Sequence, residues 1–172
     1  MRRSADRIGL RISPQNTFNE IDDSNPQALF NYVLTSLSDK GLAYLHVVEG
    51  DLTGKPVSPF DYARIKNLFG GLYIANNGYD KPRADAAIAQ HNVDAIAFGK
   101  PSIANPDLVT RFLLDAPLSP IDQTTLYGGA EKGYTDYPLL SAVPDSVTPF
   151  TSQCVPALNR RDDDPSKTSD QV

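Results

Sequence analysis

The sequence predicts an α/β fold with a parallel sheet, and three observations lead to this fold class. Four short runs are almost continuously apolar, as strands covered on both faces tend to be. Amphipathic helical patterns alternate with these runs, which is typical of βαβ units. Long polar stretches rich in glycine and proline follow strands at residues 13–25 and 49–58, where barrel enzymes keep their active-site loops. Four such units form a small open sheet or half of a (β/α)8 barrel, and the loops favour the half-barrel.

The predicted strands are residues 8–12, 43–48, 72–75 and 95–98. The first predicted helix follows Ser24 or Asn25 as its N-cap and has Pro26 in its first turn. Its apolar residues recur every four positions, at Leu29, Val33 and Leu37. This spacing places them on one face of the helix.

Three further helices are predicted between and after the strands. Ser58 and Pro59 open the second helix, whose apolar face is formed by Tyr62, Ile65 and Phe69. The third follows Asp80 and carries Ala84, Ala87 and Ile88. The fourth opens at Asn105 and Pro106 and carries Leu108, Phe112 and Leu113. Each start combines an N-cap residue or a proline with an apolar period close to 3.6.

Composition limits the possible function classes. The chain has 172 residues, whereas a complete (β/α)8 barrel needs about 250. The net charge of −5 argues against a general nucleic-acid binder. The single cysteine, Cys154, excludes an intramolecular disulfide and a cysteine-based zinc cluster. No apolar run is long enough to cross a bilayer, and the basic start leads into charged residues, not into the apolar core of a signal peptide. We therefore expect a cytoplasmic protein with no nucleic-acid or membrane partner.

The composition changes near Ser141. Four prolines and the charged run at residues 160–164 follow. Such stretches bury too little apolar surface to fold stably. We predict one domain at residues 1–140 and a poorly ordered, proline-rich acidic tail at residues 141–172, with a short docked helix as the alternative.

Arg11 is a candidate ligand-binding residue because it lies within an apolar strand. Burying an arginine without a partner is costly. At a strand end that faces a site, its guanidinium could meet an anionic or electron-rich edge of a ligand. The alternative is an ion pair with an acidic side chain, such as Glu49 on the next strand.

Two glycine turns follow the third and fourth predicted strands. Asn76, Asn77 and Gly78 form the first, in which asparagine and glycine tolerate positive φ and can present backbone N–H groups. Gly99 and Lys100 form the second and add a cation. Taken singly, each is an ordinary turn. On adjacent parallel strands, the pair matches the phosphate site that barrel enzymes build after strands 7 and 8.

The sequence predicts no catalytic residue and no metal ligand. His46 is interpreted as a hydrogen-bonded packing residue, the usual role of a lone histidine within a strand. No G-x-S-x-G, P-loop or H-E-x-x-H motif occurs, and no carboxylates form an evident acid/base pair. The Gly- and Tyr-rich stretch at residues 125–138 predicts a compact loop that caps a ligand or closes the end of a barrel.

These segments resemble, in their order, the C-terminal half of Old Yellow Enzyme-type alkene reductases, from about Asp6 to Leu139. The matching motifs are Arg7–Pro14, Leu42–Glu49, Ile74–Tyr79, Phe98–Leu108 and Gly133–Pro138. The resemblance implies strands 5–8 of a (β/α)8 TIM barrel. It also implies FMN as the cofactor, NAD(P)H as the reductant and an activated alkene, a small molecule, as the substrate.

The resemblance also implies a role for each candidate residue. The guanidinium on the first strand would lie against the pyrimidine edge of the flavin, and the two glycine turns would hold the FMN phosphate. Two residues of the Gly- and Tyr-rich loop would lie beside the dimethylbenzene end. The residues expected to bind FMN are Arg11, Asn76, Asn77, Gly78, Gly99, Lys100, Leu126 and Tyr127.

Three of these positions depart from the family pattern. Lys100 stands where arginine is usual, which keeps the charge and loses bidentate phosphate recognition. Asn77 stands where glycine is common, at little cost because asparagine tolerates positive φ. Leu126 replaces a usual phenylalanine and loses an aromatic contact with the flavin.

The family's substrate-binding His pair and its proton-donating tyrosine lie on the earlier half of the barrel. We therefore expect a C-terminal fragment that lacks these residues and is inactive alone. An open half-barrel exposes sheet edges, so the expected partner is a separate N-terminal half-barrel or a second copy of the chain. The alternatives are a non-catalytic half-barrel that binds flavin or phosphate and an inactive remnant of a truncated gene.

Overall fold

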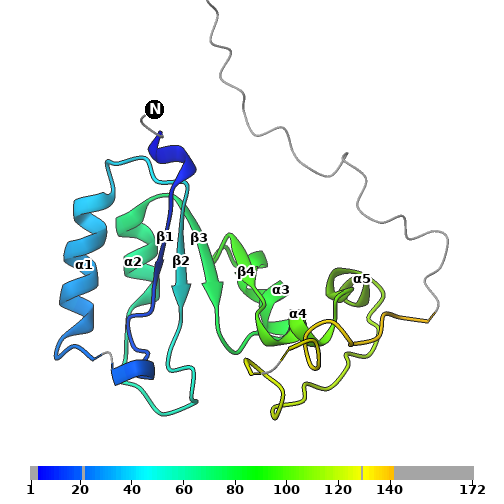
Figure 1. Ribbon diagram of the computed structural model, residues 1–172. Helices are drawn as coiled ribbons and strands as arrows, with labels where there is room; N and C mark the ends of the chain where they lie inside the picture. The colour runs from blue at the N-terminus through cyan, green and yellow to red at the C-terminus, as the bar shows by residue number, and fades with distance from the viewer. Residues whose placement is uncertain (1–3, 21, 129, 142–172) are drawn as a thin grey trace, which may run out of the picture. The chain divides into compact units, whose positions relative to one another are not determined.

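In a computed structural model of the chain, four parallel strands form one sheet in the order β1-β2-β3-β4 (Figure 1). The strands are Gly9–Ile12 (β1), Tyr44–Val48 (β2), Leu72–Asn76 (β3) and Ala95–Ala97 (β4). All four predicted strands are confirmed, to within one residue at either end. The structure describes residues 4–20, 22–128 and 130–141.

Five α-helices and two short 3-10 helices accompany the sheet within the described residues. The 3-10 helices are Ala5–Arg7 (η1) and Phe18–Glu20 (η2). The α-helices are Pro26–Leu37 (α1), Tyr62–Phe69 (α2), Lys81–Ala89 (α3), Lys100–Ala104 (α4) and Leu108–Leu113 (α5).

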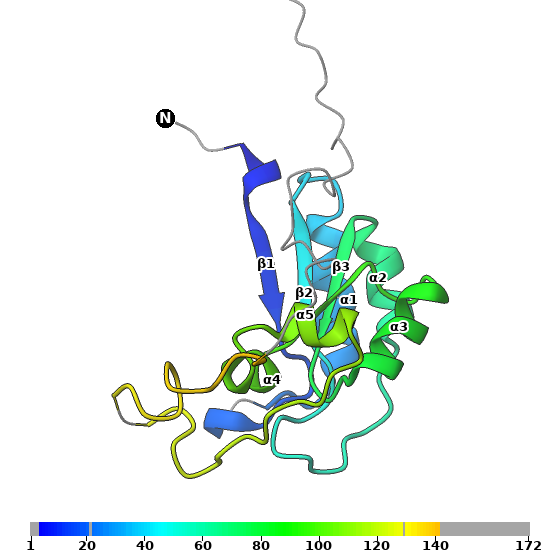
Figure 2. The ribbon, with the colours of Figure 1, turned by 90° about the vertical axis from the view of Figure 1, so that its right-hand side faces the viewer.

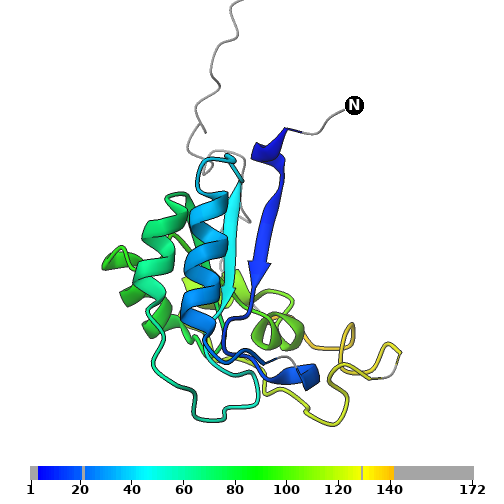
Figure 3. The same cartoon turned by 90° about the vertical axis from the view of Figure 1, so that its left-hand side faces the viewer.

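Helices α1, α2 and α3 pack on one face of the sheet. Figure 3 shows α1 and α2 in front of the strands, and Figure 2, from the opposite side, shows them behind. Leu34, Ile65, Phe69 and Ala87 of these helices pack with alternate strand residues: Leu10, Ile12, Leu45, Val47, Tyr73, Ala75 and Ile96. Sequential strand order with all crossover helices on one face is the arrangement of a (β/α)8 barrel, whereas a doubly wound sheet carries helices on both faces.

Side-chain caps fix the starts of the three crossover helices. Asn25, Asp61 and Asp80 each accept a hydrogen bond from the N–H group three residues further on, at 3.1, 2.8 and 2.8 Å. The predicted starts after Asn25 and Asp80 are confirmed. The prediction that Ser58 and Pro59 open the second helix is wrong, because the capping carboxylate of Asp61 starts α2 after it.

The stretch after β4 forms two short helices where one was predicted. The Gly99 carbonyl accepts hydrogen bonds from the N–H groups three and four residues further on, at 3.0 and 3.2 Å, and so starts α4. The predicted start at Asn105 is wrong, because α5 begins only at Leu108. Leu113, one of the apolar residues named for the predicted helix, is 68% exposed, whereas Arg111 of the same helix is buried.

The chain divides into two units, Met1–Leu139 and Leu140–Val172. The predicted tail, apart from Ser141, lies outside the described residues. No described helix has the length and apolar character needed to cross a membrane. Within residues 4–20, 22–128 and 130–141, no group of three His, Cys, Asp or Glu side chains is placed to hold a metal.

Candidate functional site

The face of the sheet opposite the helices is the candidate site, and we refer to it as the inner face. Because strand side chains alternate in direction, it is formed by the residues between those of the core. They are Gly9, Arg11, Tyr44, His46, Val48, Leu72, Ile74, Asn76, Ala95 and Ala97. This surface is mostly apolar, and its only charged side chain is that of Arg11. Tyr44 and Leu72 remain 40% and 55% exposed.

Arg11 lies on β1 beside His46 of β2 and is exposed. No hydrogen bond or ion pair joins its guanidinium to another described residue. The alternative prediction of a pair with Glu49 is wrong. Glu49 follows β2 on the helix-covered side, where the hydroxyl groups of Tyr73 and Tyr79 donate to its two carboxylate oxygens at 3.0 and 2.8 Å. The Arg11 guanidinium is therefore available to a ligand on the inner face.

The cluster around Glu49 is structural. Burial, with the nearby Glu49 charge, raises the pKa of Tyr79 to about 12 and raises the pKa of Tyr73 as well. Both hydroxyl groups therefore stay protonated at neutral pH and keep donating to the carboxylate. The Arg83 guanidinium lies 4.2 Å from the centre of the Tyr79 ring, which holds that side chain against α3.

His46 carries an unsatisfied polar atom. Its Nε2 is buried and has no hydrogen-bond partner among the described residues. Burial, and then the positive charge of Arg11, lower the pKa of His46 below the ordinary value of 6.5, so the imidazole is neutral at pH 7. The interpretation of His46 as a hydrogen-bonded packing residue is wrong, because no described residue offers a hydrogen bond to its buried Nε2. A buried nitrogen without a partner costs free energy, so a partner from elsewhere is expected.

The turn after β3 has the predicted backbone geometry. Asn77 and Gly78 have positive φ angles of 91° and 69°. The Asn76 side-chain amide donates to the Ala97 carbonyl at 2.6 Å and ties the ends of β3 and β4 together. The Asn77 amide donates to two carbonyl groups of the loop after β2, at 2.7 and 3.3 Å. Both side-chain amides thus shape the turn. The Gly78 carbonyl accepts a hydrogen bond from Arg83, so a ligand could meet only the backbone N–H groups of Asn77 and Gly78.

Gly99 and Lys100 lie after β4, at the same edge of the sheet as the turn after β3. Gly99 is exposed, and a Cβ on it would meet nothing within 4 Å. Lys100 is the first residue of α4, is exposed, and forms no hydrogen bond or ion pair with another described residue. The predicted turn is thus the start of a helix, and it offers open space beside an uncommitted cation.

Leu126 and Tyr127 lie in the segment that follows α5. Leu126 is half-buried, whereas Tyr127 is 69% exposed and has a φ of 62°. Within the described residues, no hydrogen bond or ring contact joins either of them to Arg11 or Lys100. The sheet thus brings Arg11 and the two turns together. Leu126 and Tyr127 are not linked to Arg11 or Lys100 by a hydrogen bond or ring contact within the described residues.

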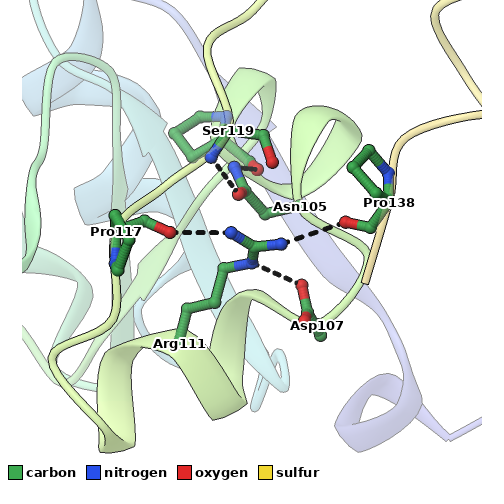
Figure 4. Close-up of polar contacts among 7 residues, drawn as sticks. Asn105, Asp107, Arg111, Pro117, Ser119 and Pro138 are labelled. Carbon is green, nitrogen blue, oxygen red and sulfur yellow. Dashed lines mark hydrogen bonds and ion pairs between the residues drawn. The ribbon is translucent and has the colours of Figure 1, made fainter. Parts of the chain in front are cut away.

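Two buried side chains hold the segment after α5 in place (Figure 4). Arg111 donates to the Asp107 carboxylate at 2.6 Å and to the carbonyl groups of Pro117 and Pro138 at 2.7 and 3.0 Å. Asn105 accepts a hydrogen bond from a backbone N–H of the same segment at 2.7 Å. The sequence analysis missed the buried bonding roles of both side chains and the free Nε2 of His46. The only sequence signal for Arg111 was its position within the apolar pattern of α5.

The comparisons with known proteins agree with this geometry. The family described as NADH:flavin oxidoreductase / NADH oxidase matches residues 1–117. The chain belongs to this family. The putative 12-oxophytodienoate reductase 11 of Oryza sativa subsp. japonica is 39% identical over 140 residues, which are 79% of this chain and 38% of that protein. A probable flavin mononucleotide-dependent alkene reductase of Leishmania infantum is 37% identical over 135 residues, 78% of this chain and 36% of that protein.

Solved structures confirm the resemblance to Old Yellow Enzymes. The old yellow enzyme from Trypanosoma cruzi superposes with a TM-score of 0.74 at 40% identity, over 79% of this chain and 36% of that chain. Morphinone reductase superposes with a TM-score of 0.72 at 41% identity, over 81% of this chain and 38% of that chain. The chain therefore spans less than two fifths of the length of these relatives.

Proposed function

We propose that the chain forms the FMN-binding half of an Old Yellow Enzyme-type barrel, strands 5 to 8, which serves the NAD(P)H-dependent reduction of activated alkenes. The observation that carries this proposal is Arg11, an unpaired cation on the inner face of a barrel-type sheet. Family membership supports FMN as the ligand. An exposed guanidinium on a mostly apolar surface fits a planar ring with one electron-rich edge.

Further observations test the fit between FMN and this site. The uncommitted Lys100 and the open space beside Gly99 fit the phosphate, at the same sheet edge as the turn of Asn77 and Gly78. The carboxyl ends of barrel strands are where such phosphate sites are built. We assign Leu126 and Tyr127, on the resemblance alone, to the dimethylbenzene end of the ring.

The residues of the chain would then bind FMN, orient it and polarise its ring. When bound, FMN supplies the hydride-transfer chemistry, and the protein contributes position and electrostatics. Arg11 would hold the pyrimidine edge and stabilise negative charge there. Lys100 would anchor the phosphate as a point charge, with less directional control than an arginine.

Fluorescence titration of FMN with the purified full chain tests this proposal. We expect saturable binding that Arg11→Ala and Lys100→Ala each weaken by about tenfold or more, since a charge-assisted hydrogen bond contributes about 1.5–3 kcal/mol. Arg64→Ala is the matched control, because Arg64 is exposed on α2, away from the inner face. Binding that is equal in all four proteins would contradict the assigned site.

The titration, together with an alkene-reduction assay and an unfolding curve, also separates the alternatives. FMN binding without NAD(P)H-dependent alkene reduction, even in a completed barrel, would favour a non-catalytic flavin-binding half-barrel. A chain that shows no cooperative unfolding and no FMN binding would favour an inactive remnant.

A further inference from the structure

The segment after α5 folds back on itself as two limbs, residues 117–128 and 130–138, which we call the arm. At its base, the buried guanidinium of Arg111 donates to the carbonyl groups of Pro117 and Pro138, one on each limb (Figure 4). The Asp107 carboxylate, at 2.6 Å, balances the charge of the same guanidinium. Arg111 therefore closes the arm at its base.

Two further contacts hold the limbs together beyond the base. The Asp122 N–H donates to the Tyr137 hydroxyl at 2.9 Å. Nearer the tip, Gly133 is buried and has a φ of 81°, and a Cβ on it would clash with the Thr125 side chain. Only glycine combines the backbone freedom and the missing side chain that this approach requires. The closed arrangement of the two limbs therefore depends on Gly133.

Asn105 fixes the arm to α4, the helix that begins with Lys100. The residue is 1% exposed, and its side chain accepts a hydrogen bond from the Ser119 N–H of the first limb at 2.7 Å. The same amide group donates to the Pro101 carbonyl of α4 at 2.9 Å. One buried side chain thus bonds to the arm and to the helix at once. The arm therefore has a set position relative to the Lys100 cation.

Tyr127 is the outlier on this arm. Its φ of 62° lies in the left-handed region, which costs free energy in an aromatic residue, yet its side chain is 69% exposed. No hydrogen bond, ion pair or ring contact joins that side chain to another described residue, so no such contact offsets the cost. Backbone strain at an exposed residue on a well-fixed loop is typical of a position that meets a ligand.

We propose that Gly133 and Arg111 are positioning residues for flavin binding. By closing the arm on α4, they hold the strained Tyr127 at the distance from Lys100 that one ligand spans, with its phosphate at the lysine and its ring at the tyrosine. This inference rests on the proposed function, which supplies FMN as the ligand. Gly133 and Arg111 touch neither the ligand nor a reacting atom and act only through the arm.

Hydrogen exchange of the free chain and fluorescence titration with FMN together test the inference. Gly133→Ala should speed exchange in both limbs and weaken FMN binding about threefold to tenfold, the loss expected for one aromatic contact. Gly128→Ala is the matched control in the same arm and should change neither quantity, because a Cβ on Gly128 would meet nothing within 4 Å.

A double variant separates positioning from a general structural role. Tyr127→Ala alone should weaken FMN binding by a similar factor. Adding Gly133→Ala to it should cost less than about twofold more, because the arm then has no ring to place. If Gly133→Ala shows no cooperative unfolding, Tyr137→Phe, which removes only the acceptor of the Asp122 N–H, takes its place in every comparison.

Three outcomes would overturn the inference and leave the proposed function intact. They are exchange in the limbs that Gly133→Ala does not change, FMN binding that stays equal although exchange shows the arm open, and an equally large further loss in the Tyr127→Ala background. A folded wild-type chain that binds no FMN would instead reject the proposed function, and this role for the arm with it.

Discussion

Arg111 is a buried cation, and two of its hydrogen-bond partners lie outside its own helix, in the segment that follows α5. It is 5% exposed and bonds to Asp107, Pro117 and Pro138. Its carbonyl partners lie 6 and 27 residues away, which no local pattern encodes. The guanidinium therefore joins α5 to the segment that carries Leu126 and Tyr127.

Replacing this arginine should destabilise the protein strongly. Arg111→Met removes the donor of two carbonyl groups and the ion pair with the Asp107 carboxylate, and losing one partner of a buried pair costs about 3–5 kcal/mol. Urea unfolding monitored by circular dichroism measures the loss. The matched Arg64→Met exchange on the surface of α2 should change stability by no more than about 0.5 kcal/mol. Equal effects would show that the Arg111 contacts contribute little.

His46 should make stability depend on pH. Burial and the Arg11 charge lower its pKa, so just below its ordinary value of 6.5 the unfolded chain binds more protons than the folded chain. This contribution to stability is therefore fully present above pH 6.5 and decreases as the pH falls toward the folded-state pKa. The unfolding midpoint of the wild type should fall more steeply from pH 7 to 5 than that of His46→Gln. Parallel pH profiles would show that His46 titrates alike in both states.

At the scale of elements, the sequence predicted the strands and helix starts that depend on residues close together in the chain. The strands follow from apolar runs, and the starts of α1 and α3 follow from Asn25 and Asp80. The α4 helix was missed because its five residues contain Pro101 and little periodicity, so its start depends on the Gly99 carbonyl. Which face of the sheet the Arg11 side chain occupies could be assigned only from the register between β1 and β2. Glu49 lies on the other, helix-covered side, so it is excluded as the partner of Arg11.

The cap of α3 gives a direct test at this scale. Asp80→Ala removes the acceptor of the Arg83 N–H and should cost about 1 kcal/mol of stability. Asp39→Ala is a control because Asp39 is exposed after α1 and pairs only with Lys40 among the described residues. Thermal unfolding of both variants makes the comparison. If both had the same midpoint, the cap would have no special role.

At the scale of the whole molecule, the decisive property is that the three crossover helices α1, α2 and α3 all pack on one face of the sheet. Neither Arg11 nor His46 finds a hydrogen-bond partner among the described residues, and both belong to the other face. The sequence analysis predicted a half-barrel and an interaction with another half. It could not predict the free Nε2 of His46, because that depends on which atoms surround the ring in three dimensions.

Uncovered apolar surface should control aggregation. Leu72→Lys places a charge on the inner face at a site that is 55% exposed, so it should lower light scattering on heating and change stability by no more than about 0.5 kcal/mol. Leu113→Lys, on α5 at 68% exposure, is the matched control and should leave scattering nearly unchanged. A larger effect at Leu113 would place the aggregating surface elsewhere.

The turn at Asn77 and Gly78 has a chemical consequence for the lifetime of the protein. This is the one Asn-Gly dipeptide in the sequence, the pair in which the glycine nitrogen most readily attacks the asparagine side chain to form a succinimide. In the folded chain the Asn77 amide is held by the carbonyl groups of Glu49 and Asp51 and must leave both before that ring can close. Deamidation at this site therefore proceeds through local opening of the turn. The damaged form, which has lost the donor, no longer fastens the loop after β2, so ageing loosens the edge of the sheet where β2 and β3 end.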